Sequence, residues 1–100
     1  MIKHIVMWKL VDSYEGMSKK DITDKLTEMF NTLPALIPAI RTLEVAANCN
    51  ANETEADYVL ITTHDSMDEL KQYAVHPEHK KVGEFIGKVK LTRVCVDYEI

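Results

Sequence analysis

The sequence has 100 residues, with 12 basic and 16 acidic side chains that give a formal net charge of −4 at pH 7. This length fits a single domain over residues 1–100, and the 46% hydrophobic and 28% charged content is typical of a globular chain rather than a disordered one. A nucleic-acid-binding protein needs a basic stripe, yet no run of Lys and Arg exceeds two residues. We therefore expect no nucleic acid among its partners.

The cysteines and the first ten residues indicate the compartment. Cys49 and Cys95 are isolated and form no CxxC pair, which suits a reducing environment. Residues 1–10 carry Lys3, His4 and Lys9 among apolar side chains, so they resemble neither a signal peptide nor a membrane-spanning segment. We expect a small soluble protein of the cytoplasm that does not associate with a membrane.

The first half of the chain predicts a strand, a helix and a second strand. Residues 2–10 alternate, and the side chains that share one face of this strand are Ile2, His4, Val6, Trp8 and Leu10. Ser18 and Asp21 form a capping-box pattern before apolar residues at helical spacing, which predicts a helix from Ser18 to about Leu33. Pro34 and Pro38 should end this helix and hold the connection extended. Residues 40–47 then predict a second strand.

The second half predicts two more strands on either side of a broken helix. Residues 58–63 are rich in β-branched and aromatic side chains, as strands are, and they follow a polar turn over residues 48–55. Ser66 and Glu69 form a capping box, and Pro77 should restart the helix, because proline is favoured at the first helical position. Residues 89–100 alternate again and predict the last strand. The restarted helix should turn inward Val82, Phe85 and Ile86.

This order of elements predicts an α+β protein of ferredoxin-like βαββαβ topology, with a four-stranded antiparallel sheet and helices on one face. The other face should also be apolar. Ile5 and Met7 alternate with further apolar residues in the first strand, as Val94 and Val96 do in the last. A single copy has no second layer to cover that face, so we expect a homodimer in which two sheets pack together.

Residues 70–79 contain a Tyr-x-x-His-Pro-x-His element. Together with three further stretches of the sequence, this element resembles the stress-responsive A/B barrel (Dabb) family, and it is the most specific of the four. Residues 2–10 are similar to the first strand of that family, residues 42–45 to its second strand, and residues 97–99 to its closing strand. The resemblance covers essentially the whole chain, and it implies a dimeric α+β barrel.

The resemblance also implies a candidate activity. In one branch of the family, plant polyketide cyclases make resorcylic acids by an intramolecular aldol condensation that needs no metal or organic cofactor. The Tyr and His residues of that branch match Tyr73, His79 and His4 of this chain. Two positions depart from the branch: Tyr58 stands where it has a His, and Phe30 stands where it has a Tyr. Some groups that would orient a polyketide are therefore absent.

Each candidate catalytic residue has a chemical role and a structural alternative. Neutral His79 could take a proton from carbon, whereas its structural role would be to satisfy a backbone group at a helix start. The Tyr73 hydroxyl could donate to a developing enolate oxygen or, alternatively, to a backbone carbonyl within the core. His4 could orient one of these groups or hold a substrate oxygen, and its structural alternative is a core histidine with one hydrogen bond.

Between sheet and helices we expect a cavity for a small, partly apolar, carbonyl-containing molecule. The apolar and aromatic residues expected to line it are Val6, Tyr58, Phe30 and Phe85. His76 and His79 lack the further ligands that a zinc site needs, so we expect no metal. His76 should act near the helix cap, and Cys95 should be a small buried hydrophobe.

The sequence leaves the function open between several classes. The first is a dimer that binds a ligand and performs cofactor-free, lyase-like or cyclase-like acid–base chemistry. The second is a non-enzymatic, stress-associated protein. The third is a cofactor-free monooxygenase-like or haem-associated α+β barrel. No GxxxxGK[ST] or GxGxxG motif occurs, so the sequence shows no nucleotide-binding loop. We expect no cofactor.

Overall fold

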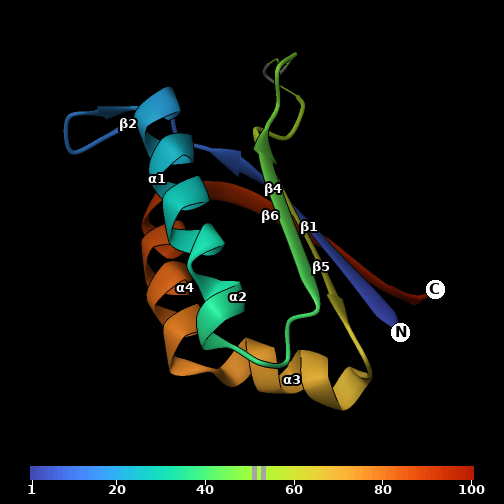
Figure 1. Cartoon of the computed structure of the whole chain (residues 1–100). Helices are drawn as coiled ribbons and strands as arrows, with labels where there is room; N and C mark the ends of the chain where they lie inside the picture. Colours follow the sequence, from blue (N-terminus) through green and yellow to red (C-terminus); the bar gives the residue numbers. More distant parts are fainter. Residues whose placement is uncertain (51, 53) are drawn as a thin grey trace.

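A four-stranded antiparallel sheet forms one layer of the molecule, and helices form the other (Figure 1). The computed structural model describes residues 1–50, 52 and 54–100. The strand order is β4-β5-β1-β6, and each neighbouring pair is antiparallel. The sheet consists of β1 (Ile2–Leu10), β4 (Thr42–Ala47), β5 (Tyr58–His64) and β6 (Lys90–Glu99). This arrangement confirms the predicted ferredoxin-like α+β fold.

In the described part of the chain, four helices cover one face of this sheet and leave the other face open (Figure 1). They are α1 (Lys19–Asn31), α2 (Leu33–Leu36), α3 (Met67–Val75) and α4 (Pro77–Val89). The core lies between the layers, where Leu26 and Phe30 of α1 and Val89 of α4 are buried with Val6 and Leu60 of the sheet. Among the described residues, no helix is both long and apolar enough to cross a membrane.

The helix starts follow the capping signals in the sequence. The Ser18 side chain accepts a hydrogen bond from the Asp21 backbone N–H, and the Asp21 carboxylate accepts one from the Ser18 N–H. This confirms the capping box of α1. At α3 only half of the expected box is present, because Ser66 accepts from the Glu69 N–H and no reciprocal bond is described. One hydrogen bond at the N-cap satisfies one of the free N–H groups of the first turn.

Two segments differ from the expectation. Residues 33–36 form the short helix α2 with Pro34 in its first turn, so the prediction that this connection is extended was wrong there. Proline is compatible with a first helical turn because the N–H that it lacks has no intrahelical partner at that position. The strands β2 (Ser13–Tyr14) and β3 (Met17–Ser18) form a small hairpin that the sequence analysis missed. Glu15 and Gly16 both have positive φ at its turn, as the type I′ turn of a two-residue hairpin requires.

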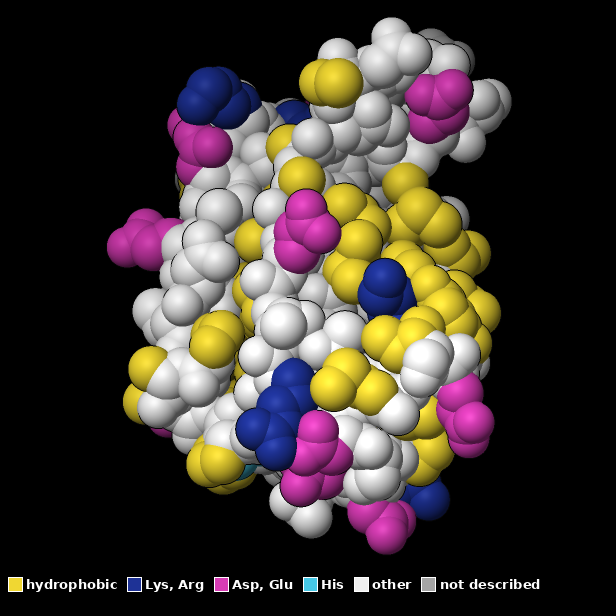
Figure 2. Space-filling model, turned by 45° about the vertical axis from the view of Figure 1, so that its right-hand side comes forward, with side chains coloured by type: hydrophobic (Ala, Val, Ile, Leu, Met, Phe, Trp, Pro, Cys, Tyr) yellow, Lys and Arg dark blue, Asp and Glu magenta, His cyan; other side chains and the backbone are white. Residues whose placement is uncertain are grey.

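The open face of the sheet is apolar along β1 and β6. Met7 pairs with Val94, Ile5 pairs with Val96, and Lys3 pairs with Tyr98, so these side chains share one face. Met7 is 40% exposed, Val94 56% and Val96 52%. Figure 2 shows hydrophobic side chains gathered on this side of the molecule, where no helix covers the sheet. An apolar surface of this kind is typical of an interface.

Candidate functional site

A small cavity lies between the helix layer and the sheet. Its volume is about 140 Å³. A larger surface hollow of about 590 Å³ surrounds Lys9, Lys19 and Asp57, but there the two ammonium groups already pair with the carboxylate. The smaller cavity instead includes four of the predicted site residues, namely His4, His79, Val6 and Phe30. Its wall consists of His4, Val6, Trp8, Phe30, Leu60, His79, Gly83, Ile86, Lys90 and Arg93.

The break between α3 and α4 places His79 against Tyr73. His76 caps α4 by accepting a hydrogen bond from the Glu78 N–H through Nδ1, which agrees with the cap role expected for it. Pro77 begins the new helix, and His79 follows in its first turn. The rings of Tyr73 and His79 then lie 4.4 Å apart between centroids, at an interplanar angle of 58°. The helix restart thus brings a tyrosine of one helix against a histidine of the next.

Among the described residues, hydrogen bonding of His79 leaves one ring nitrogen available as a base. Its Nδ1 lies 3.1 Å from the carbonyl oxygen of Ala74. Since a carbonyl can only accept, Nδ1 carries the proton in the neutral ring, and Nε2 presents a lone pair. Burial lowers the pKa of His79 below its ordinary value. The ring is therefore neutral at pH 7 and able to take a proton at Nε2.

The Tyr73 hydroxyl is buried and has no hydrogen-bond partner among the residues described. Tyr73 is only 1% exposed, and burial raises the pKa of its hydroxyl, which therefore keeps its proton. Its ring also lies near His4, at 6.2 Å between centroids, and near His64, at 5.1 Å. Tyr73 itself does not belong to the cavity wall. A buried hydroxyl without a partner carries a desolvation cost, which a hydrogen bond to a ligand oxygen would relieve.

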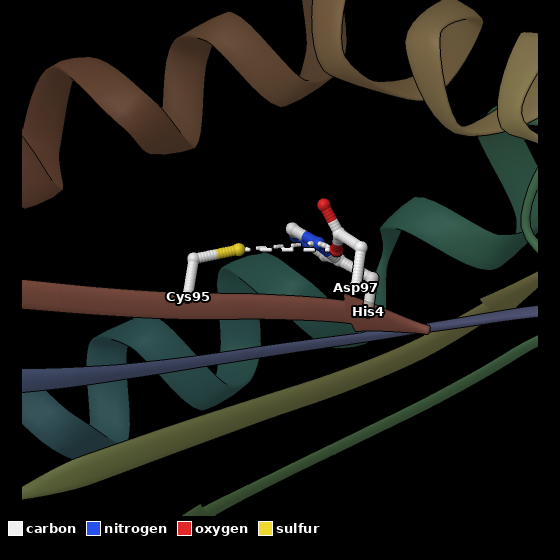
Figure 3. Close-up of side chains that lie close together, drawn as sticks. All are labelled: His4, Cys95 and Asp97. Atoms are coloured by element: carbon white, nitrogen blue, oxygen red, sulfur yellow. Dashed lines mark hydrogen bonds and ion pairs between the residues drawn. The ribbon is translucent and has the colours of Figure 1, made fainter. Parts of the chain in front are cut away.

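His4 is held by an acidic partner on the neighbouring strand. Its Nδ1 lies 2.5 Å from Oδ1 of Asp97, the residue directly opposite it in the β1–β6 register (Figure 3). The Cys95 thiol lies 3.6 Å from the same nitrogen and 3.8 Å from the same oxygen. Burial raises the pKa of this thiol, and the Asp97 carboxylate adds to the effect. The expectation that Cys95 is a buried hydrophobe was wrong, because the edge strand β6 leaves it exposed.

His64, at the end of β5, is a third histidine near the Tyr73 ring, and the sequence patterns did not assign it to the site. Its Nδ1 lies 2.7 Å from the carbonyl oxygen of Ala39, and its Nε2 lies 2.9 Å from the Thr62 hydroxyl. Burial lowers the pKa of its ring. Both nitrogens are occupied, so His64 supports the Tyr73 ring but presents no free base. The alternation of the third strand, which puts His64 on the same face as Tyr58, could have located it.

The four predicted lining residues divide between the cavity wall and the core outside it. Val6 and Phe30 belong to the cavity wall. Tyr58 and Phe85 are buried but lie outside that wall. The Tyr58 hydroxyl is 2.7 Å from the hydroxyl of Thr27, and the Lys25 ammonium lies over the Phe85 ring at 4.4 Å. Tyr58 and Phe85 are therefore core residues that do not line this cavity.

Comparison with known proteins matches the chain to one family and one fold. The family model of the Stress responsive A/B Barrel Domain matches residues 2–100. A stress-response A/B barrel domain-containing protein of Arabidopsis thaliana is 29% identical over 85 residues, which are 82% of this chain and 30% of that protein. The chain thus spans less than a third of the length of this relative.

Solved structures share the fold over nearly the whole chain. A dimeric protein of unknown function and ferredoxin-like fold from Bacteroides fragilis has a TM-score of 0.88 and 39% identity, covering 99% of this chain and 95% of that one. A hydroxynitrile lyase from Passiflora edulis has a TM-score of 0.77 and 15% identity, covering 99% of this chain and 92% of that one. At such low identity the second similarity concerns the fold alone.

Proposed function

Because this chain belongs to the stress-responsive A/B barrel (Dabb) family, we propose that it is a homodimer that binds a small, partly apolar carbonyl compound in its sheet–helix cavity. On that ligand it performs acid–base chemistry of the cyclase or lyase type without a cofactor. One observation carries the proposal. The Nε2 of His79 and the hydroxyl of Tyr73, neither of which has a hydrogen-bond partner among the described residues, belong to two rings in contact.

The two groups have complementary roles on one carbonyl. His79 Nε2 takes a proton from the carbon next to the carbonyl, and the electron pair of that C–H bond moves to form an enolate. The Tyr73 O–H donates a hydrogen bond to the enolate oxygen, where negative charge develops. In the cyclase reaction the enolate carbon attacks a second carbonyl of the same molecule. The protonated His79 then returns its proton to the new alkoxide, so that no proton is gained or lost.

The cavity wall supports a ligand with both apolar and acidic parts. Val6, Trp8 and Phe30 provide an apolar and aromatic surface, whereas Lys90 and Arg93 provide two positive charges. These charges favour a carboxylate or an enolate oxygen over a cation. A β-keto acid with an alkyl or aryl tail has this combination of groups.

The open face of the sheet supports the homodimer. The exposed side chains of Met7, Val94 and Val96 need a covering layer, and the same face on a second copy would supply it. The relative from Bacteroides fragilis, at 39% identity, is described as dimeric. An obligate interface of this type should bury about 2,000 Å² or more.

Exchange of carbon-bound hydrogen tests the first chemical step directly. Proton NMR in D₂O would follow deuterium incorporation next to the carbonyl of β-keto acids with alkyl or aryl tails. We expect the protein to accelerate this exchange and His79→Ala to slow it by about 10²–10⁴-fold, the usual contribution of a positioned base. His76→Asn is the matched control, since His76 lies outside the cavity wall and Asn preserves a capping acceptor.

The rate of hydrogen exchange in His79→Ala decides whether His79 is a catalytic base or only satisfies a backbone group. Full exchange activity in a folded His79→Ala variant would contradict the catalytic assignment. Binding of the keto acids without accelerated exchange would leave a ligand-binding protein and would also overturn the enzymatic part of the proposal.

A further inference from the structure

We propose that His4, Cys95 and Asp97 form a zinc-binding site, with three protein ligands and a fourth position open to a further ligand at the edge of the cavity. The site goes beyond the proposed acid–base function, which assigns no role to Cys95. It also differs from the histidines considered in the sequence, since neither His76 nor His79 belongs to it.

The positions of the three donor atoms fit a tetrahedral metal. His4 Nδ1, Cys95 Sγ and Asp97 Oδ1 all lie within 4.8 Å of one another. In a tetrahedral zinc site, bonds of about 2.0–2.3 Å place neighbouring ligand atoms about 3.3–3.7 Å apart. The Sγ–Nδ1 distance of 3.6 Å and the Sγ–Oδ1 distance of 3.8 Å already come close to this spacing. Only the Nδ1–Oδ1 pair, at 2.5 Å, has to open to admit the ion.

The backbone places these donors without help from a flexible loop. Cys95 and Asp97 are two residues apart on β6 and so point to the same side, and Asp97 pairs with His4 across the ladder. All three side chains lie on the side of the sheet that faces the helices (Figure 3). His4 also lines the cavity, whereas Cys95 and Asp97 are exposed and lie outside its wall. An ion held by the three would therefore lie at the edge of the cavity, where its fourth position is accessible to a further ligand.

The donor set selects the metal. A thiolate and an imidazole favour zinc over magnesium or calcium, which prefer ligand sets made of oxygen. The negative charges of a thiolate and a carboxylate match the charge of a divalent ion. Three protein ligands with one open position are the arrangement of catalytic rather than structural zinc sites. Arg93 in the cavity wall adds a positive charge, so the fourth position favours an anionic oxygen ligand.

Zinc binding would change the state of His4. The ion replaces the proton between His4 and Asp97 and also displaces the thiol proton of Cys95, because a metal ligand must be deprotonated. The Asp97 carboxylate then holds the metal instead of the imidazole N–H. His4 is consequently fixed as a ligand, while His79 and Tyr73 are left unchanged.

Calorimetric titration with zinc chloride tests the site. The intact protein would first be dialysed against a chelator and kept in a phosphine reductant. We expect one zinc ion per chain, and we expect Cys95→Ala and Asp97→Asn each to weaken binding by at least about 10–100-fold, which is what loss of even an outer partner of a metal site can cost. Cys49→Ala is the matched control, because Cys49 is the other exposed thiol. It should bind zinc like the unaltered protein.

Cobalt(II) gives a second readout that does not depend on affinity. A thiolate-to-cobalt charge-transfer band should form in the unaltered protein and in Cys49→Ala, and it should be absent in Cys95→Ala. Thermal unfolding of each variant separates loss of the site from loss of the fold. The proposal is overturned by the absence of stoichiometric zinc, by unchanged binding in Cys95→Ala, or by an effect confined to only one of the two ligand variants.

The zinc proposal and the acid–base proposal can fail separately. Zinc titration requires no substrate, and His79→Ala should lose hydrogen exchange while it still binds one zinc ion. Loss of zinc in His79→Ala together with retention in Cys95→Ala would place the metal elsewhere and refute this assignment.

Discussion

The two faces of the sheet carry different kinds of side chain. On the face beneath the helices, β1 and β5 hold His4 and His64, and both are buried. On the open face, β1 and β6 hold Met7, Val94 and Val96, which are exposed and apolar. The two histidines thus lie within an otherwise apolar core, where helices exclude water, whereas the apolar side chains of the open face lie where no layer covers them. We infer that the first face serves chemistry and the second serves assembly.

On the helix-facing side, two histidines that contact Tyr73 differ in how many of their ring nitrogens have hydrogen-bond partners. His64 uses both ring nitrogens, on the Ala39 carbonyl and the Thr62 hydroxyl. His79 uses one, on the Ala74 carbonyl. Burial lowers the pKa of both rings. A lowered pKa therefore does not distinguish a structural histidine from a reactive one, but the number of occupied nitrogens does.

The largest expected effect is on stability, from His64→Ala. This variant removes a fully buried ring and leaves the Ala39 carbonyl and the Thr62 hydroxyl without partners. We expect a loss of roughly 3–5 kcal/mol in the free energy of unfolding. In contrast, His79→Ala should lose about 1 kcal/mol, because it breaks one exposed hydrogen bond. Urea unfolding of both variants measures the difference, and equal losses would contradict the distinction between the two histidines.

The sequence predicted a good part of this arrangement from local patterns. Alternation in residues 2–10 placed His4 with Val6 and Trp8, and Pro77 predicted the helix restart in whose first turn His79 lies. Both signals act over a few residues. The Cys95–His4 contact spans 91 positions and depends on the register between β1 and β6, which no local pattern encodes. Alternation also assigned Cys95 to a face of β6, but it could not reveal that the helices leave this edge strand exposed.

The second effect concerns the open face and should leave the cavity intact. Val94→Lys places a charge in the centre of the expected sheet-on-sheet interface, where an unpaired charge costs several kcal/mol to bury. We expect self-association to weaken by at least about 10²-fold. Val75→Lys is the matched control, since Val75 is also exposed but lies on α3. Sedimentation equilibrium measures both, and a stable monomer of the unaltered protein at micromolar concentration would refute the dimer.

A smaller effect is the pH dependence of the free energy of unfolding. The folded-state pKa values of His64 and His79 lie below the ordinary value of 6.5. The unfolded state therefore binds more protons below pH 6.5, so stability is fully present above that pH and is lost as pH falls through the folded-state pKa values. Urea unfolding at pH 7.5, 6.5 and 5.5 should show this decline. His64→Gln should flatten it, and an unchanged slope in that variant would assign the decline to other groups.

The smallest effect is the most diagnostic, because stability and activity should change in opposite directions. Tyr73→Phe removes a buried hydroxyl that has no partner among the described residues and keeps the ring that packs against His79. Removing an unsatisfied buried polar group relieves a desolvation cost, so we expect the protein to gain about 0.5–1 kcal/mol in the free energy of unfolding. The same variant can no longer donate a hydrogen bond to the enolate oxygen, so we expect hydrogen exchange in the keto acids to slow by at least about 10-fold. The matched control is Tyr58→Phe. The Tyr58 hydroxyl already pairs with Thr27, so its removal should destabilise the protein. A destabilised Tyr73→Phe variant with full exchange activity would show that this hydroxyl is structural, and the helix-facing side would then lose its distinction as the chemical face.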